Sequence, residues 1–284
     1  MRRSLQPNKQ NKQKLHGLML VPLMLLCVEP GYARCSRPIQ VPVSAYSYTV
    51  IVKANKFSGI LPDVLSAIEA KSNCKFVYTL VPKNRQEILF ETGQSDLLVT
   101  AVRTVRRDKF GIFFPFVQLR ATLISMEGQF PPMHSVKDII ARSEMKLVVV
   151  RGYDYGPAYL AIVDEMNKLG RVLVEPDPTS VAKLIKSNPK YVTIMAPTIF
   201  SGIIQSEPLL EDLVGKVRFE KLEELNWTDS GVYFSKITLS TSDRAYLNAQ
   251  FEKYAKTDNI WKSYLNYYPP EVIKIGIRPR EVGH

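Results

Sequence analysis

Short apolar runs alternate with amphipathic runs along most of this chain. IQVPVS, KFVYTLVP and DLLVTAV have the apolar, β-branched character of buried strands. LPDVLSAIEAKSN lies between the first two strands and places its leucines, Val64 and Ile68 on one helical stripe, and NRQEILFETG is a second helix with a glycine stop. Strands separated by helices predict a mostly parallel sheet covered on both faces.

The same alternation then starts again. SVKDIIARSE reads as a helix, MKLVVVRG as a buried strand, and PAYLAIVDEMNKLG as a helix that begins at Pro157 and ends before Gly170. RVLVEP, TSVAKLIKSN and YVTIMAP continue as strand, helix and strand, and Thr198 is expected to cap one more helix, IFSGIIQ. Two α/β units in succession predict two lobes, each with its own sheet.

The last quarter of the chain does not begin a third unit. KVRFEKLEEL and SGVYFSK read as short strands, and STSDRAYLNAQFEKYAK and DNIWKSYLNYY as amphipathic helices that need a partner surface, which we expect to be the first lobe. The chain then crosses between lobes near RATLIS and near SGVYFS, as a two-stranded hinge above a cleft. The predicted boundaries are 34–121 and 230–284 for lobe 1 and 122–229 for lobe 2, with a surface strap from Pro269 onward.

Residues 1–33 have the pattern of a secretory signal peptide. A basic, polar segment precedes the apolar run LHGLMLVPLMLLCV, and Gly31 and Ala33 supply the small residues of a cleavage site. The run is about 14 residues long and contains Pro22, whereas about 20 residues are needed to span a bilayer, so an uncleaved anchor is the alternative. Arg34 directly before Cys35 argues against a lipoprotein. Export to the periplasm is therefore predicted.

Composition adds modest constraints. The chain has 284 residues, 45% of them apolar, which is enough for two lobes of ordinary size. Its formal net charge is +11, and residues 1–33 carry five basic side chains against one acidic, so the remainder carries 11 − 4 = +7. Net charge of this size concerns steering and solubility.

Two cysteines remain after cleavage at Ala33, since Cys27 leaves with the signal. Cys35 and Cys74 each lie just before a predicted strand, and in a parallel strand–helix–strand unit both strand starts lie at the same end of the sheet. We predict that they form a disulfide, which would stabilise the fold by about 4 kcal/mol in the chain-entropy model. Two free buried thiols are the alternative.

Residues for common catalytic chemistry are scarce. His16 lies in the signal, His284 is terminal, and His134 follows a proline pair in a predicted surface loop. The sequence contains no HExxH, G-x-S-x-G or phosphate-binding glycine loop, so we predict no catalytic residues, no metal and no cofactor. An acid pair of Asp154 and Glu175 facing the cleft is the remaining route to an enzyme, such as a periplasmic dehydratase acting on a carboxylate substrate.

Basic residues are concentrated in the stretch DLLVTAVRTVRRDKFGIFFPF, where a buried strand leads into three arginines. Nucleic-acid binding is disfavoured, because these arginines alternate with strand residues and do not lie along an exposed aromatic face. The stretch belongs to an ordered series of short motifs: Gly59 to Asp63, Pro82 to Arg85, Leu89 with Gly93 and Asp96, Thr104 to Arg107, and FFPF from Phe113.

This series resembles the bacterial extracellular solute-binding proteins of family 3, the amino-acid type that serves ABC importers and has the type II periplasmic binding protein fold. VVVRGYDYG and FEKYAKTDNIWKSYL continue the resemblance, which covers nearly all of the chain after the signal. It implies an α/β fold of two lobes that close on a small solute. It also implies a membrane permease or sensor as partner, and we expect the protein to be a monomer.

The resemblance implies that Arg107 grips a ligand carboxylate with its two-pronged guanidinium. Thr104 would start the short helix that carries Arg107, so that backbone N–H groups also face the anion, and Thr100 would add a hydroxyl at the end of its strand. Arg103 and Arg106 are interpreted as a solvated basic turn, or as partners of Asp96 or Asp108.

Aromatic side chains supply a second kind of candidate contact. The resemblance implies that Tyr46 or Tyr48, after the first strand, stacks on the ligand. Tyr153 is predicted to contact the ligand from the second lobe, where Gly152 and Gly156 free the backbone before a helix. Each tyrosine can equally be a packing residue.

The family pattern fails at one important position. Relatives place an aspartate at the end of a second-lobe strand to hold the ligand's ammonium group, but here the strand YVTIMAP ends in Ala196 and Pro197. An ammonium buried without its partner is costly, unless Asp154 reaches in. Val102 also replaces a small polar residue. A carboxylate-bearing solute, an amino acid or a related organic anion, is therefore predicted, with no required ammonium.

Overall fold

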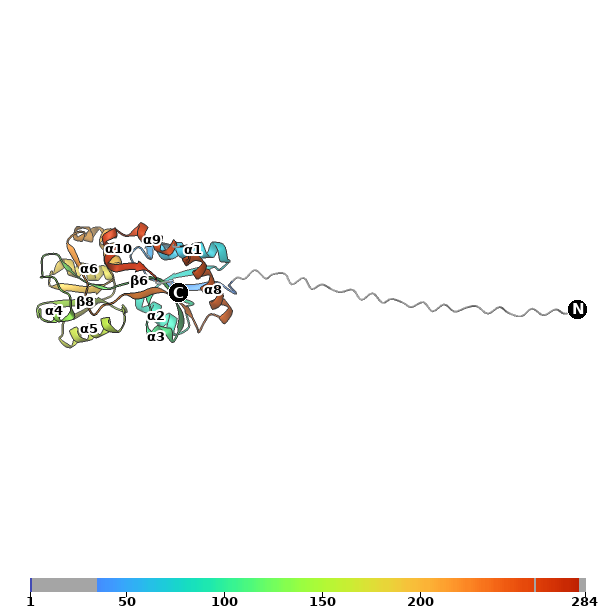
Figure 1. Ribbon diagram of the computed structural model, residues 1–284, viewed down its shortest axis with the longest axis horizontal. Helices are drawn as coiled ribbons and strands as arrows, with labels where there is room; N and C mark the ends of the chain where they lie inside the picture. The colour runs from blue at the N-terminus through green and yellow to red at the C-terminus, as the bar shows by residue number, and fades with distance from the viewer. Residues whose placement is uncertain (2–34, 258, 281–284) are drawn as a thin grey trace. The chain divides into compact units, whose positions relative to one another are not determined.

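The computed structural model describes Met1 and residues 35–257 and 259–280. The predicted signal peptide and its cleavage site lie outside the described residues. No helix in the described ranges is long and apolar enough to span a bilayer. The predicted fold class is confirmed, because the chain is an α/β protein with a five-stranded and a four-stranded sheet as its two main sheets, beside two two-stranded ones (Figure 1).

The first sheet combines strands from before and after the second. Its order is β13 (Ile277–Pro279), β6 (Gly111–Leu119), β12 (Thr228–Ser235) and β5 (Leu97–Val102). All of its pairings are antiparallel. Beside it, β1 (Ile39–Val43) and β4 (Phe76–Leu80) form a parallel pair, and β2 (Ile51–Lys53) and β3 (Lys56–Ser58) form a hairpin.

The second sheet is mixed. Its order is β11 (Val217–Glu220), β7 (Thr122–Met126), β10 (Tyr191–Met195), β8 (Lys146–Val150) and β9 (Val172–Glu175). β10, β8 and β9 are parallel, and β7 runs antiparallel to β10. The expectation of mostly parallel sheets is therefore met only in part, because β6 and β12, which lead to and from the second sheet, run in opposite directions.

The predicted helices are present in the predicted order. The helices of the described residues are α1 (Ile60–Ser72), α2 (Lys83–Glu91), α3 (Val105–Asp108), α4 (Val136–Ile140), α5 (Pro157–Lys168), α6 (Pro178–Ser187), α7 (Pro197–Ser206), the 3-10 helix η1 (Pro208–Leu213), α8 (Thr241–Ala255), α9 (Asn259–Tyr267) and α10 (Pro270–Gly276). Of these, η1 and α10 were not predicted. The expected surface strap from Pro269 onward was wrong, because this segment forms α10 with Val272 and Ile273 buried, followed by β13, which pairs with β6. Thr198 is not the cap of α7: the helix begins at Pro197, with Ala196 at its N-cap, because the fixed backbone of proline suits a first helical position.

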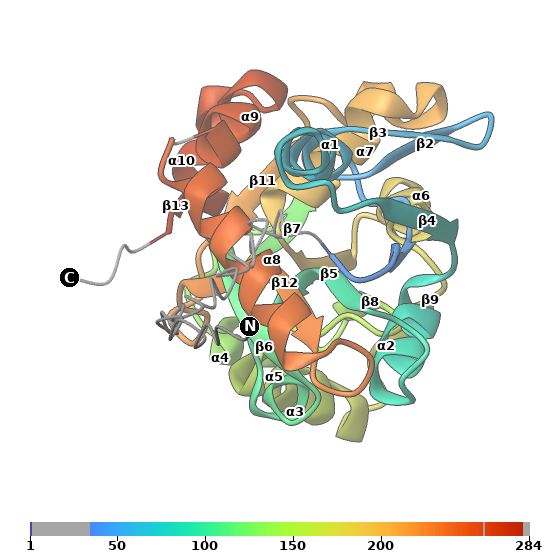
Figure 2. The same cartoon turned by 90° about the vertical axis from the view of Figure 1, so that its right-hand side faces the viewer.

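The chain passes between the sheets twice, from β6 to β7 and from β11 to β12. α8 packs on the first sheet, where the Phe251 ring lies 5.5 Å from Phe114 and 5.1 Å from Phe234. Figure 2 shows α9, α10 and β13 on one side of the folded unit and α2 on the other. The positions of the lobe boundaries stay a prediction.

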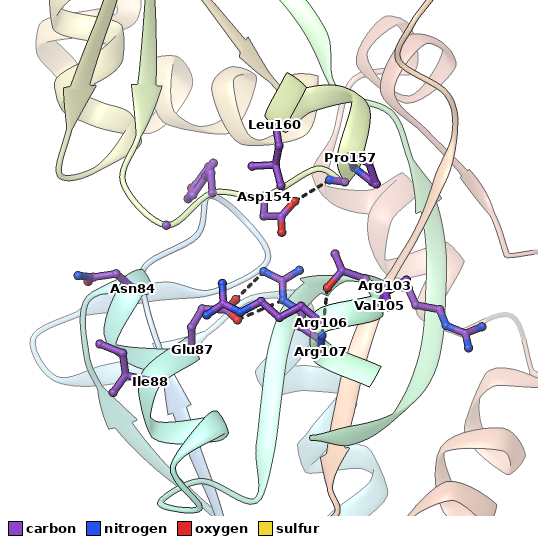
Figure 3. A pocket seen from close by; sticks show the side chains of 14 residues that line it. Asn84, Glu87, Ile88, Arg103, Val105, Arg106, Arg107, Asp154, Pro157 and Leu160 are labelled. Carbon is purple, nitrogen blue, oxygen red and sulfur yellow. Dashed lines mark hydrogen bonds and ion pairs between the residues drawn. The ribbon is translucent and has the colours of Figure 1, made fainter. Parts of the chain in front are cut away.

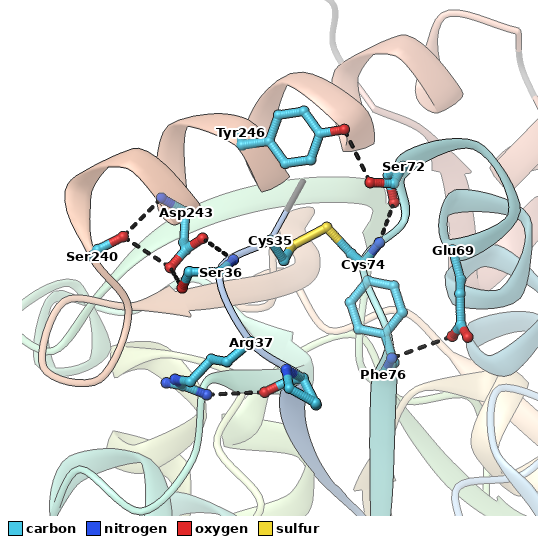
Figure 4. The surroundings of a disulfide bond; sticks show 11 residues. Cys35, Ser36, Arg37, Glu69, Ser72, Cys74, Phe76, Ser240, Asp243 and Tyr246 are labelled. Carbon is cyan, nitrogen blue, oxygen red and sulfur yellow. Dashed lines mark hydrogen bonds between the residues drawn. A yellow bond between two sulfur atoms is a disulfide. The ribbon is translucent and has the colours of Figure 1, made fainter. Parts of the chain in front are cut away.

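The predicted disulfide between Cys35 and Cys74 is present, with their Cα atoms 5.0 Å apart (Figure 4). The parallel register pairs Ile39 with Phe76, so both strands start at the same end, as the pattern indicated. Asp243 at the start of α8 accepts hydrogen bonds from the Ser36 backbone N–H at 2.9 Å and from its hydroxyl at 2.6 Å. The first strand is thereby attached to both α1 and α8.

Candidate functional site

A cavity of about 580 Å³ lies where loops after β5 and after β8 face each other. Three segments line it: Asn84, Glu87 and Ile88 of α2, residues 103–107, and the segment after β8 with Gly152, Tyr153, Asp154, Gly156, Pro157 and Leu160 (Figure 3). Ligands of open α/β sheets bind beyond the carboxyl ends of strands, and β5 and β8 both end here. The cavity is therefore the candidate site.

Arg107 lies in the wall of this cavity and is 4% exposed. Thr104 is the N-cap of α3, as expected, and its hydroxyl accepts a hydrogen bond from the Arg107 backbone N–H at 3.2 Å. The guanidinium already has a carboxylate partner, because its Nε and Nη2 donate to the two oxygens of Glu87 at 3.2 and 2.5 Å. Its Nη1 donates to the Val102 carbonyl at 2.8 Å. The predicted ligand-binding fork is thus held by the protein itself.

The two other arginines of the turn form exposed ion pairs. Arg103 contacts Asp108 at 3.1 Å, and Arg106 contacts Glu91 at 2.8 Å. Exposed pairs of this kind contribute little to stability. The pairing of Arg103 with Asp108 matches one of the predicted alternatives, whereas the pairing of Arg106 with Glu91 was not predicted.

Thr100 lies outside the cavity lining but close to it, and its backbone has φ of +53°. A β-branched residue rarely adopts this left-handed conformation, so the end of β5 is a strained point. Lys83 of α2 donates to the Thr100 hydroxyl at 3.1 Å and to the carbonyls of Val99 and Thr100, both at 3.2 Å. Burial lowers the pKa of the Lys83 amine to about 8.

Neither Lys83 nor Glu87 was predicted from the sequence. Their spacing of four residues places them on one face of α2. Glu87 could have been predicted as a partner of an arginine, because it is an acidic residue on the helix that precedes the cluster of three arginines. Nothing in the pattern indicated that Lys83 would reach the end of β5.

Three tyrosines fill the space beside the cavity. The Tyr46 ring lies 5.9 Å from that of Tyr153, which in turn lies 6.0 Å from that of Tyr155. Tyr153 lines the cavity, whereas Tyr46 and Thr100 line a separate void of about 20 Å³ that extends to Ala196. Burial raises the pKa of the Tyr46 hydroxyl and that of Tyr153 above the ordinary tyrosine range.

Tyr48 lies elsewhere. Its hydroxyl donates to Gln205 of α7 at 3.3 Å, and its ring packs 5.4 Å from that of Tyr268. It lines a different cavity of about 400 Å³, together with Asp177 and Glu207. The structure therefore does not bring Tyr48 to the site that contains Arg107.

Asp154 lies on the wall opposite Arg107 and Glu87, as Figure 3 shows. One carboxylate oxygen accepts the Gly156 backbone N–H at 2.7 Å. Within the described ranges Asp154 forms no ion pair, which leaves its charge open to a cation. Glu175, its proposed partner in an acid pair, is not among the residues that line the cavity.

The departure at Ala196 and Pro197 is visible in the structure. Pro197 is the first residue of α7, and the Ala196 N–H donates to the Tyr155 hydroxyl at 3.3 Å. The Tyr155 hydroxyl therefore lies beside Ala196, at the position where the predicted family pattern has an aspartate. No group of three histidine, cysteine or acidic side chains in the described part of the chain is arranged to hold a metal ion.

No family model and no curated protein matches the sequence. Solved structures do match the fold. An ancestral arginine-binding protein bound to arginine has a TM-score of 0.64 and 15% identity, over 82% of this chain and 98% of that one. The GluR0 ligand-binding core in complex with L-glutamate has a TM-score of 0.64 and 16% identity, over 82% and 99%.

A third similar structure is ArtJ from Geobacillus stearothermophilus, an arginine-, lysine- and histidine-binding protein. Its TM-score is 0.65 and its identity 12%, over 84% of this chain and 99% of that one. These identities establish the fold alone. The chain has the two-lobed fold of amino-acid-binding proteins, spanning nearly the whole length of each of these neighbours.

Proposed function

We propose that the protein is a solute-binding protein that holds a small solute in the cavity between the β5–α3 segment and the β8–α5 loop. The liganded protein is then presented to a membrane importer or sensor. The predicted signal peptide supports a periplasmic location, and no catalytic step is required. The observation that carries the proposal is the cavity of about 580 Å³ with walls from both sheets, a volume that suits a small molecule.

The neighbours support this proposal. They include proteins bound to arginine, glutamine or L-glutamate, and the substrate-binding protein of an amino acid ABC transporter. The sequence-based prediction of a carboxylate-bearing solute held by Arg107 stays a prediction. A solute carboxylate reaches both prongs of Arg107 only by replacing Glu87.

A thermal-shift screen of the purified protein against amino acids, organic acids, amines and short peptides tests the proposal. A solute at 100 times its dissociation constant stabilises a protein by about 2.7 kcal/mol. Leu160 lines the cavity from α5 and is 48% exposed, so Leu160→Trp is expected to obstruct the site and weaken binding at least about tenfold.

Leu169 provides the matched control. It lies at the end of α5, is 51% exposed and does not line the cavity, so Leu169→Trp should leave the affinity unchanged. A screen without any stabilising solute would count against the proposed function. A solute that binds Leu160→Trp as tightly as the original protein would place the site elsewhere.

A further inference from the structure

The Glu87 carboxylate contacts Arg107 with the geometry of a bound carboxylate ligand. Arg107 is 4% exposed and Glu87 is 7% exposed, and the two side chains meet through two hydrogen bonds. This is the arrangement by which a guanidinium holds a free carboxylate. Three of the five guanidinium N–H groups are engaged once the bond to Val102 is included.

Displacing Glu87 is costly. A solute carboxylate would have to break the buried pair and leave the Glu87 charge without its partner, and an unpaired buried carboxylate costs several kcal/mol. The charge of Arg107 is meanwhile neutralised. A carboxylate solute therefore finds no free cationic fork at this point.

The same helix also supplies an ammonium group. Lys83, one turn before Glu87 on α2, donates to the carbonyls of Val99 and Thr100 at the end of β5, and its Nζ lies 5.7 Å from the centre of the Tyr46 ring. These carbonyls and this ring are the partners that the ammonium group of a solute would use. Lys83 and Glu87 together thus occupy positions suited to an ammonium and a carboxylate.

The other charged residues of the cavity wall also favour a cationic solute over a carboxylate. Arg103 is paired with Asp108 and Arg106 with Glu91. Among the charged side chains of the described wall, Asp154 alone is without an ion pair, and it faces the cavity (Figure 3).

We infer that Glu87 is a resident carboxylate ligand of Arg107 that determines the charge preference of the cavity, excluding carboxylates from Arg107 and favouring solutes that present an amine or guanidinium group to Asp154. This inference rests on the proposed function for its solute class. Glu87 thereby acts as a specificity-determining residue.

Removing the resident carboxylate tests the first half. In Glu87→Ala, the space beside Arg107 is open, and formate or acetate is expected to fill it. We expect the melting temperature of this variant to rise saturably with acetate, relative to sodium chloride at the same ionic strength. The original protein should show an acetate affinity at least tenfold weaker.

Glu91→Ala is the matched control, because it removes an acid from the same helix whose partner Arg106 is exposed and can be hydrated. It should show no response specific to acetate. If Glu87→Ala is recovered unfolded, the yield of refolded protein in acetate and in chloride replaces the melting temperature. An absent acetate effect on Glu87→Ala, or an equal effect on all three proteins, overturns the inference.

The second half is tested on the original protein with agmatine, which carries an amine and a guanidinium, and with glutarate, which carries two carboxylates. Agmatine is expected to bind at least tenfold more tightly than glutarate, and Asp154→Asn should remove that preference. Tighter binding of glutarate would overturn this half. If neither binds, the proposed solute class fails, whereas the acetate response of Glu87→Ala still reports on Arg107 independently.

Discussion

The side chains at the end of β5 show how much depends on the partner that each charged residue finds. Arg103 and Arg106 pair with acids at the surface, whereas Arg107 turns inward to Glu87. Of these pairs, we expect the buried one between Arg107 and Glu87 to have the largest effect on stability and binding. A single truncation of Arg107 leaves Glu87 charged and unpaired, so loss of stability would accompany any loss of binding.

Lys83 carries a prediction on pH dependence. Burial, opposed by the nearby charge of Glu87, lowers its pKa from 10.5 to about 8 in the folded protein, and the unfolded chain keeps the ordinary value. Between these values the unfolded state holds a proton that the folded state lacks. The contribution of Lys83 to the free energy of unfolding therefore rises as pH increases through this window.

We expect the free energy of unfolding of the original protein, minus that of Lys83→Met, to grow by about 1–2 kcal/mol between roughly pH 7.5 and 10. Urea unfolding followed by fluorescence at both pH values measures it. Lys71→Met, at an exposed position near the end of α1, is the control for removing one lysine. A difference that shrinks as the pH rises would contradict the assignment.

At the scale of elements, several interactions hold β1 and the residues just before it in place beside the first sheet. It pairs with β4 in parallel, and the disulfide and Asp243 attach its start to α1 and α8. Arg37 adds a bidentate contact to the buried Asp96 with both distances 2.6 Å. The pKa of Asp96 lies below its usual value, because the hydrogen bonds from Arg37 and Gln40 outweigh the opposing effect of burial.

The disulfide should stabilise this arrangement measurably. Its cysteines are 39 positions apart, and closing a loop of that length is worth about 4 kcal/mol in the chain-entropy model. Replacing both cysteines by alanine is expected to lower the free energy of unfolding by about 2–4 kcal/mol in urea titrations. A reductant should reproduce this loss in the original protein and have no effect on the double variant. Equal stability with and without the bond would show that the loop is held by other contacts.

At the scale of the whole folded unit, the segment after β1 packs directly on α7 of the second sheet. The Ser47 hydroxyl donates to the Thr198 carbonyl at 3.0 Å, and Gly202 lies so close that a Cβ there would be 1.8 Å from Ser47 Oγ and 3.0 Å from its Cβ. Gly276 of α10 approaches Pro197 in the same way, with 2.8 Å available. In this structure, α7 of the second sheet is therefore in close contact with the segment after β1 and with α10.

Gly202→Ala is expected to push this segment away from α7 and lower the free energy of unfolding by about 1–3 kcal/mol, the usual cost of overpacking. Adding Ser47→Gly should restore much of the loss, because it removes both clashing atoms, and glycine suits the φ of +51° at this position. Urea unfolding of the single and double variants measures both effects. An undiminished stability of Gly202→Ala would mean that the contact is not maintained in solution.

Local patterns were sufficient for much of the fold. Apolar runs located eight of the thirteen strands in the described residues, because a buried strand must be apolar along its length whatever its neighbours are. The positions of Cys35 and Cys74 before two such strands were enough to predict their bond. Local patterns could not predict whether neighbouring strands run parallel or antiparallel. β6 and β12, for example, pair with each other although more than a hundred residues separate them in the chain.

The candidate site was predicted less completely. Tyr153 and Asp154 line the cavity with Arg107 and Thr104, whereas Tyr46, Tyr48 and Thr100 do not. Glu87, which pairs with Arg107, and Lys83, which contacts Val99 and Thr100 of β5, lie on a helix that the sequence did not single out. Their roles arise from the direction in which α2 packs against β5.

The sequence by itself determined the order of most helices and strands, the cysteine pair and the Thr104 cap of the short helix that carries Arg107, because each depends on residues close together in the chain or on burial alone. Only the tertiary structure decided which carboxylate Arg107 meets. That choice depends on distances between side chains from α2, α3 and the end of β5, and such distances follow from packing and not from local sequence.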